Sequence, residues 1–171
     1  FHLIFFIIIC FLVSIYELNK MIKKIRFKIL GTFFLIFSFY TFYETSISHT
    51  EIFVLLVCVS TDIGGYFFGK LFKGPKLTKI SPNKTYSGMI GGYFLSLISL
   101  SLFMNWINHL VDIEWFIVTI FISTASQIGD IIISYFKRLS KVKDTGKILP
   151  GHGGLLDRID GMIFAFPIFY L

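Results

Sequence analysis

Charged residues are scarce in this sequence, and so are cysteine and proline. Only 15% of the 171 residues are charged, whereas an average soluble domain carries roughly 25%. Two cysteines and four prolines are too few for a disulfide scaffold, a collagen-like repeat or a proline-rich disordered chain. Hydrophobic residues make up 55% of the chain and include 22 Phe. The composition excludes a soluble globular domain and indicates an integral membrane protein.

Apolar runs long enough for membrane helices recur along the chain, since one crossing needs about 20 mostly apolar residues. The runs lie at about 1–18, 29–43, 52–69, 88–104, 115–136 and 159–171. We therefore predict an all-α polytopic integral membrane protein with about six transmembrane helices, the last of them short. Cys10 and Cys58 lie inside such runs and are expected to pack or to face lipid. Because the chain opens at Phe1 rather than Met, upstream sequence is expected, and the start of the chain is treated as arbitrary.

Basic residues are missing from two of the segments between the runs. All 16 Lys and Arg lie within 20–28, 70–84 and 137–158, whereas 44–51 and 105–114 contain none. By the positive-inside rule, the three basic segments are predicted to be cytoplasmic and the other two external. The basic face should attract anionic lipid. Nucleic acid is not an expected partner, because no soluble basic domain is present to bind it.

Two carboxylates, Asp62 and Asp130, lie within apolar runs, where acids are costly enough to indicate function. Each lies about 10 Å from the predicted cytoplasmic end of its helix, at about 1.5 Å per residue. Polar residues around Asp130 recur at helical spacing and predict a stripe that faces protein or water. The stripe consists of Ser123, Gln127, Asp130, Ser134 and Lys137. The alternative is that both acids only make hydrogen bonds between helices.

The second basic segment contains the turn Ser81-Pro82-Asn83-Lys84-Thr85 at the start of the fourth predicted helix. Hydroxyls and an ammonium at a helix N-terminus favour phosphate binding. The alternative is an ordinary capping turn, since Ser, Thr and Asn are common caps. The segment is not a Walker A loop, because Pro75 and Lys76 follow Gly74 where Lys and Ser or Thr are required.

The third basic segment, 134–160, mixes cations, acids and glycines in one loop. Asp157 and Asp160 are three residues apart, so they share a face if the sixth helix begins near Leu156. His152 stands between glycines without a second His or a Cys nearby, which excludes a zinc site. A phosphate contact and a loop-organising role both remain open for this His.

Taken together, these motifs resemble those of the phosphatidate cytidylyltransferases, also called CDP-diacylglycerol synthases. The resemblance rests on Thr61–Lys70, Ile80–Thr85, Gln127–Asp130 and above all Ser134–Asp160. It covers about residues 60 to 160, and departs from the family pattern slightly at Asn83 and Tyr86. The resemblance implies a nucleotidyltransferase of phospholipid biosynthesis that joins CTP and phosphatidate to give CDP-diacylglycerol and pyrophosphate. It also implies a dependence on Mg²⁺, with a second cation left open.

The resemblance further suggests roles for individual residues. Asp130 and Asp157 are the expected metal ligands. Other residues expected to take part in the reaction are Lys143, Asp144, Arg158 and Asp160. Substrate binding is expected of Asp62, Ser81, Lys84, Thr85, Lys137, Arg138 and His152. In this division residues 1–51 are N-terminal membrane helices, and 52–171 form the catalytic region with loops 70–87 and 137–158.

The implied setting is a bacterial inner (plasma) membrane, with the active site open to the cytoplasm and membrane lipid around the protein; a homodimer is left open. Three other functions fit a membrane protein with intramembrane acids or basic loops less well. An ion or solute transporter would use Asp62 and Asp130 on an ion path, but the informative residues crowd the cytoplasmic loops. A CDP-alcohol enzyme would carry a different aspartate motif, which is absent. A lipid-binding scaffold leaves the two intramembrane acids unexplained.

Overall fold

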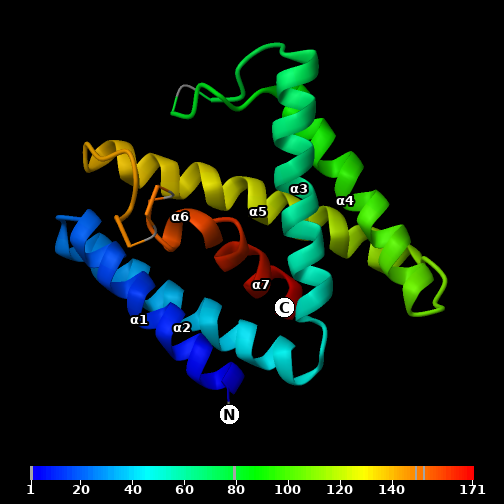
Figure 1. Ribbon diagram of the computed structural model, residues 1–171, viewed down its shortest axis with the longest axis horizontal. Coiled ribbons are helices and arrows are strands. Elements are labelled where there is room, and N and C mark those ends of the chain that lie inside the picture. The colour runs from blue at the N-terminus through cyan, green and yellow to red at the C-terminus, as the bar shows by residue number, and fades with distance from the viewer. Residues whose placement is uncertain (1, 79, 149, 152) are drawn as a thin grey trace.

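The chain is helical throughout most of its length in a computed structural model, which describes residues 2–78, 80–148, 150–151 and 153–171 (Figure 1). The helices are α1 (His2–Met21), α2 (Ile25–Ile47), α3 (Glu51–Phe72), α4 (Tyr86–Trp106), α5 (Ile113–Leu139), α6 (Leu156–Ile159) and α7 (Met162–Tyr170). Within the described residues no strand forms, and Lys76 and Thr85 make an isolated antiparallel bridge.

Helices α1 to α5 are each long and apolar enough to cross a membrane. They confirm the prediction of an all-α polytopic membrane protein. The sixth predicted helix, expected to begin near Leu156, is not continuous, because the four-residue α6 ends at Ile159 and the nine-residue α7 begins at Met162. At about 1.5 Å per residue, nine residues cover about 14 Å, so α7 is shorter than a bilayer. The structure therefore has five candidate spans where about six were predicted.

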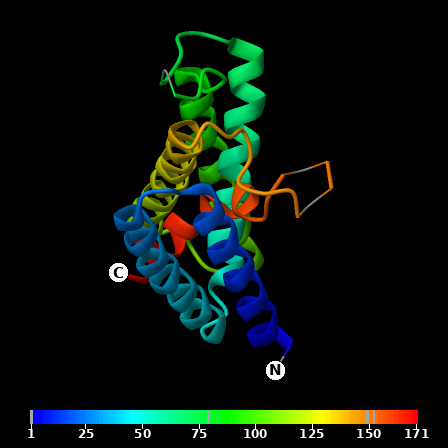
Figure 2. The ribbon, with the colours of Figure 1, turned by 90° about the vertical axis from the view of Figure 1, so that its left-hand side faces the viewer.

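Helix α7 lies between α2 and α5 (Figure 1). It contributes to both apolar cores of the protein. Ile163 packs with residues of α1, α2 and α5, whereas Ala165 and Phe166 pack with residues of α3, α4 and α5. The two cores are thereby joined through α7. In Figure 2 the α1–α2 pair lies in the foreground, and α3 runs behind it.

Helices α3 and α4 make the most extensive helix pair in the protein. Glycines allow this close approach, since a Cβ at Gly64 would overlap the backbone of Gly91, and one at Gly88 would overlap the carbonyl of Gly65. The pairing matters for function because it holds Asp62 of α3 beside the loop that enters α4.

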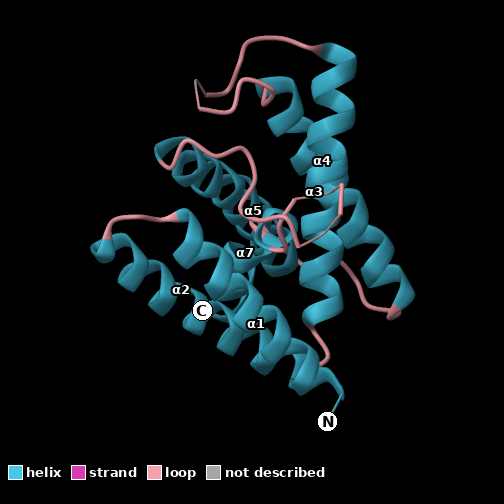
Figure 3. Ribbon diagram, turned by 60° about the vertical axis from the view of Figure 1, so that its left-hand side comes forward, coloured by secondary structure: helices cyan, strands magenta, loops and turns pink. Residues whose placement is uncertain are grey.

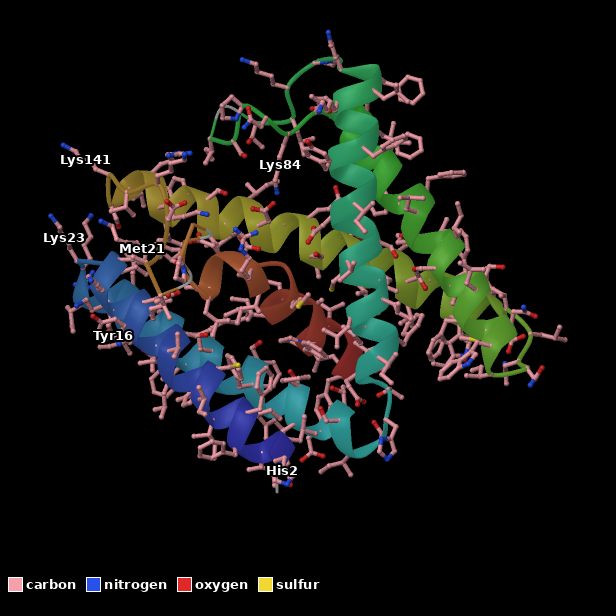
Figure 4. The ribbon with its side chains drawn as sticks, in the orientation of Figure 1. His2, Tyr16, Met21, Lys23, Lys84 and Lys141 are labelled. Carbon is pink, nitrogen blue, oxygen red and sulfur yellow. The ribbon has the colours of Figure 1, made fainter. Side chains whose placement is uncertain are left out.

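The two longest connections are the α3–α4 and α5–α6 loops (Figure 3). The first basic segment, which is the α1–α2 turn, meets the end of α5, where Lys23, Lys24 and Lys141 line a common hollow. Figure 4 shows Lys23 and Lys141 at the same edge of the protein. Segments that the charge pattern assigned to one side of the membrane therefore lie together.

Single-cysteine labelling tests the predicted orientation. In a protein without Cys10 and Cys58, a membrane-impermeant thiol reagent should label cysteines at 24, 76 and 147 only from the cytoplasmic side, because these positions lie in the basic segments. Cysteines placed at 47 and 110 should be labelled only from outside, and all five positions are exposed to a reagent. External labelling at 76 or 147 would contradict the orientation.

Candidate active site

A cavity of about 380 Å³ opens between α3, the α3–α4 loop, α5 and α6. Four aspartates from three parts of the fold line it: Asp62 of α3, Asp130 of α5, and Asp157 and Asp160 at α6. From the opposite wall the α3–α4 loop contributes Ser81, Lys84 and Thr85. The two intramembrane acids and two of the acids from the third basic segment therefore face one space.

Lys84 links the α3–α4 loop to α5. Its ammonium forms an ion pair with the carboxylate of Asp130 and donates to the carbonyl of Gln127 at 3.5 Å. Figure 4 shows this side chain pointing from the loop toward α5. The pair is still accessible, since the Lys84 and Asp130 side chains are 23% and 34% exposed. A soluble anion can therefore reach the ammonium, and a cation can reach the carboxylate.

The polar stripe of α5 faces protein and the cavity, which confirms the prediction from its spacing. At its buried end, Thr61 of α3 donates to the Ser123 hydroxyl at 2.9 Å. Gln127 lines the cavity, and Ser134 donates to Asp130 Oδ1 at 3.4 Å. At the other end Lys137 contacts α6. One face of α5 thus supplies a continuous polar wall in an otherwise apolar helix.

Asp157 is held by donors on both of its carboxylate oxygens. Lys137 Nζ donates to Oδ1 at 2.8 Å. Oδ2 accepts from the Thr145 amide at 2.8 Å and the Gly154 amide at 3.0 Å, and the Thr145 hydroxyl lies 3.0 Å from it. Burial alone would raise the pKa of Asp157, but Lys137 and the two amides outweigh it and lower the pKa below its ordinary value. Asp157 is therefore ionised at neutral pH.

Glycines shape the loop around Asp157. Gly153 has a φ of +86°, in the left-handed region that side chains with a Cβ rarely adopt. A Cβ there would also lie 2.9 Å from Asp157 Oδ2. The glycine-rich composition of this segment is thus a consequence of backbone approaching a carboxylate closely.

Glu17 of α1 is a third acid within an apolar run, and the sequence pattern did not single it out. It is fully buried and accepts hydrogen bonds from the same loop that holds Asp157. Its place near the end of an apolar run was the available signal, but nothing in the local spacing indicated its distant partners.

Comparison with known proteins gives the family of the chain. The cytidylyltransferase family profile matches residues 1–171. The chain belongs to the cytidylyltransferase family. It is 40% identical over 159 residues to the phosphatidate cytidylyltransferase of Staphylococcus aureus (strain COL). The alignment covers 86% of this chain and 61% of that protein. It is also 42% identical over 123 residues to the phosphatidate cytidylyltransferase of Brucella suis biovar 1 (strain 1330), covering 71% of this chain and 46% of that protein.

The family membership confirms the resemblance that the motifs indicated. The chain spans 61% of the length of the Staphylococcus relative, so the relatives contain further sequence. Five candidate membrane helices and bacterial relatives indicate a multi-pass protein of a bacterial membrane.

Several of the residues singled out in this cytidylyltransferase-family chain lie away from the cavity. Thr85 both lines the cavity and caps α4, where its hydroxyl accepts from the Gly88 amide at 3.1 Å, so the capping alternative for this turn also holds. Lys137 acts through Asp157. Four of the predicted site residues are exposed and do not line the cavity: Arg138, Lys143, Asp144 and Arg158. His152 lies outside the described residues.

The acids of the cavity suit a cation bound together with a phosphate. Among the residues that the structure describes, no three His, Cys, Asp or Glu side chains are grouped as a ready-made metal site. Mg²⁺ does not require one, because it is commonly held by one or two carboxylates together with water and substrate phosphates. Carboxylates that face Lys84 and hydroxyls across one cavity fit that donor set.

Proposed function

We propose that the protein is a phosphatidate cytidylyltransferase, which makes CDP-diacylglycerol and pyrophosphate from phosphatidate and CTP with the help of Mg²⁺. The observation that carries the proposal is the single cavity in which aspartates of α3, α5 and α6 face Lys84 and the hydroxyls of the α3–α4 loop. The Staphylococcus and Brucella relatives are named as phosphatidate cytidylyltransferases, which supports the same activity.

In the proposed reaction, a phosphate oxygen of phosphatidate attacks the α-phosphorus of CTP. A new P–O bond forms while the bond between the α-phosphorus and its bridging oxygen breaks, and that electron pair leaves with pyrophosphate. The attacking oxygen is already anionic, so no general base is required. Phosphoryl-type transfers depend mainly on positioning and charge neutralisation, which a cavity with acids and lysines can supply.

The residues divide this work by charge. Asp130 and Asp157 would hold Mg²⁺, which would supply charge neutralisation for the phosphates. Lys84 and Lys137 occupy these two carboxylates in the structure, and we propose that Lys84 turns to the triphosphate when substrate enters. Ser81 and Thr85 would donate to phosphate oxygens. Lys143, Asp144, Arg138, Arg158, Asp160 and His152 remain proposed participants on the strength of the motif.

The proposed setting is the bacterial inner membrane with the cavity open to the cytoplasm, where CTP is found. The lipid substrate would enter from the bilayer around α3, because Ile63 and Tyr66 next to the cavity acid Asp62 are exposed. The transporter alternative is not preferred, since the acids and lysines gather in one cavity at one level of the fold instead of marking a path across it.

Radioactive substrate transfer tests the function. The full-length protein in membranes is incubated with phosphatidate, cytidine-labelled CTP and Mg²⁺, and lipid is extracted. We expect lipid-soluble label that depends on all three additions, together with an equal amount of pyrophosphate. Label that forms without phosphatidate, or no lipid label at all, would contradict the proposal.

Replacement of Lys84 tests the phosphate-binding role of the α3–α4 loop. Lys84→Ala should raise the apparent KM for CTP by about ten- to a hundredfold, because a hydrogen bond to a charged group contributes about 1.5–3 kcal/mol. The effect on kcat should be smaller if the ammonium serves ground and transition states equally. Steady-state kinetics in mixed micelles measure both parameters. Lys76→Ala is the matched control, since Lys76 is exposed on the same loop. Unchanged kinetics for Lys84→Ala would contradict the phosphate-binding role and leave the capping turn as the role of this segment.

A further inference from the structure

We propose that Glu17 is a positioning residue of the active site, whose carboxylate on α1 fixes the loop that presents Asp157 to the cavity. The proposal rests on the function proposed above and names a residue outside the cavity. It makes the first membrane helix part of the catalytic apparatus.

Both carboxylate oxygens of Glu17 are used. Oε1 accepts from the Leu155 amide at 3.1 Å, and Oε2 accepts from the Leu156 amide at 2.9 Å and from the Thr145 hydroxyl at 3.1 Å. The side chain is 0% exposed. These donors come from two segments that contact each other around Asp157: Thr145 in the α5–α6 loop, and Leu155 and Leu156 at the start of α6. Both segments lie more than a hundred residues along the chain from Glu17.

The contacts of Glu17 continue directly to Asp157. The Thr145 hydroxyl also lies 3.0 Å from Asp157 Oδ2, and the Thr145 amide donates to the same oxygen at 2.8 Å. Leu156 immediately precedes Asp157. A shift of the Glu17 carboxylate would therefore move Asp157 from two directions, through Thr145 and through the backbone of α6.

Loop glycines leave room for this carboxylate. A Cβ at Gly146 would overlap Glu17, and a Cβ at Gly154 would overlap both Glu17 and the Thr145 hydroxyl. The Gly154 amide in turn donates to Asp157 at 3.0 Å. The backbone at 145–146 and at Gly154 thus contacts Glu17 on one side and Asp157 on the other.

Packing alone does not account for an acid at this position. The neighbouring Leu18 and Met21 of α1 are buried in the apolar core, so an apolar side chain at 17 could also be buried there. A buried carboxylate is costly unless hydrogen bonds compensate it. Among the described residues, every hydrogen-bond donor to Glu17 belongs to the segment around Asp157, which is the reason to assign it a positioning role.

The decisive variant is Glu17→Gln, which keeps the shape of the side chain. Its amide nitrogen would replace one acceptor oxygen and would point a donor at a backbone N–H or at Thr145. Outer-shell partners of metal ligands typically change metal affinity by about 10- to 100-fold when they are replaced. We expect Glu17→Gln to weaken Mn²⁺ binding by about tenfold or more, and to lower kcat at saturating CTP.

The control is Ser14→Ala, in the same buried part of α1. Ser14 is 0% exposed, and its hydroxyl donates to the Cys10 carbonyl of its own helix at 2.7 Å. Thr145→Val is a second test variant, since it cuts the link between Glu17 and Asp157 without changing a membrane helix. It guards against a Glu17 variant that fails to insert.

The experiment uses the full-length protein in detergent, without substrate, and has two readouts. Hydrogen–deuterium exchange follows the peptide that contains Leu155 and Leu156, and electron paramagnetic resonance of free Mn²⁺ measures metal binding. We expect faster exchange and weaker Mn²⁺ binding in Glu17→Gln and Thr145→Val, and wild-type behaviour in Ser14→Ala.

The outcomes separate the two proposals. Unchanged exchange and unchanged Mn²⁺ binding in both Glu17→Gln and Thr145→Val would overturn the positioning role. Equal losses in Ser14→Ala would also overturn it, because a general weakening of α1 would then explain the effect. If the unmodified protein makes no CDP-diacylglycerol, the proposed function fails, while the exchange readout still decides whether Glu17 holds the loop.

Discussion

Asp130→Asn is expected to lower turnover about a thousandfold, corresponding to about 4 kcal/mol of lost transition-state stabilisation. The reason is that its carboxylate faces the cavity on the polar wall of α5 and is proposed to hold Mg²⁺. An amide is a poor ligand for this cation and also leaves the Lys84 ammonium without its partner. The measurement is kcat for lipid-soluble label at saturating Mg²⁺ and CTP.

The matched control for Asp130→Asn is Asp112→Asn, which removes the same charge at an exposed position before α5. It should retain wild-type turnover. Both variants should insert and run as folded protein in size-exclusion chromatography, because the ion pair that Asp130 loses with Lys84 is partly exposed in the cavity. Near-normal turnover of Asp130→Asn at saturating Mg²⁺ would remove Asp130 from the metal-binding role.

Asp157→Asn should reduce turnover at least as strongly, and for two reasons. The variant loses an anionic ligand for the proposed Mg²⁺. It also loses an acceptor in the loop, since Asp157 accepts from Lys137 on one oxygen and from Thr145 and Gly154 on the other. An amide nitrogen at either place would face a donor. We expect a loss of about a thousandfold or more in kcat.

Hydrogen–deuterium exchange distinguishes the two aspartate variants. Asp157→Asn should speed exchange at the Thr145 and Gly154 amides, which donate to Asp157, whereas Asp130→Asn should leave them unchanged. Activity loss without faster exchange in Asp157→Asn would assign Asp157 to metal binding alone. Wild-type turnover in Asp157→Asn would contradict both of its proposed roles.

The amino-acid sequence by itself determined the membrane class, the positions of the first five helices and the polar face of α5. Hydropathy reports these features because a bilayer demands about 20 apolar residues per crossing, whatever the partner of each helix. Helical periodicity likewise places Gln127, Asp130 and Ser134 on one face without knowledge of the neighbouring helix. The division into residues 1–51 and 52–171 stays a prediction.

Only the tertiary structure decided which groups meet. Periodicity orients residues within one helix, but contacts between helices depend on how closely their backbones approach, as at the glycines of α3 and α4. Lys84 was predicted to bind phosphate, and the fold adds its pairing with Asp130. Hydropathy did not predict the break between α6 and α7, because it reports how apolar a segment is and not where a helix is interrupted. The role of Glu17 could not be predicted from the sequence either, because its donors come from a loop that folding brings to α1 across 128 residues of sequence.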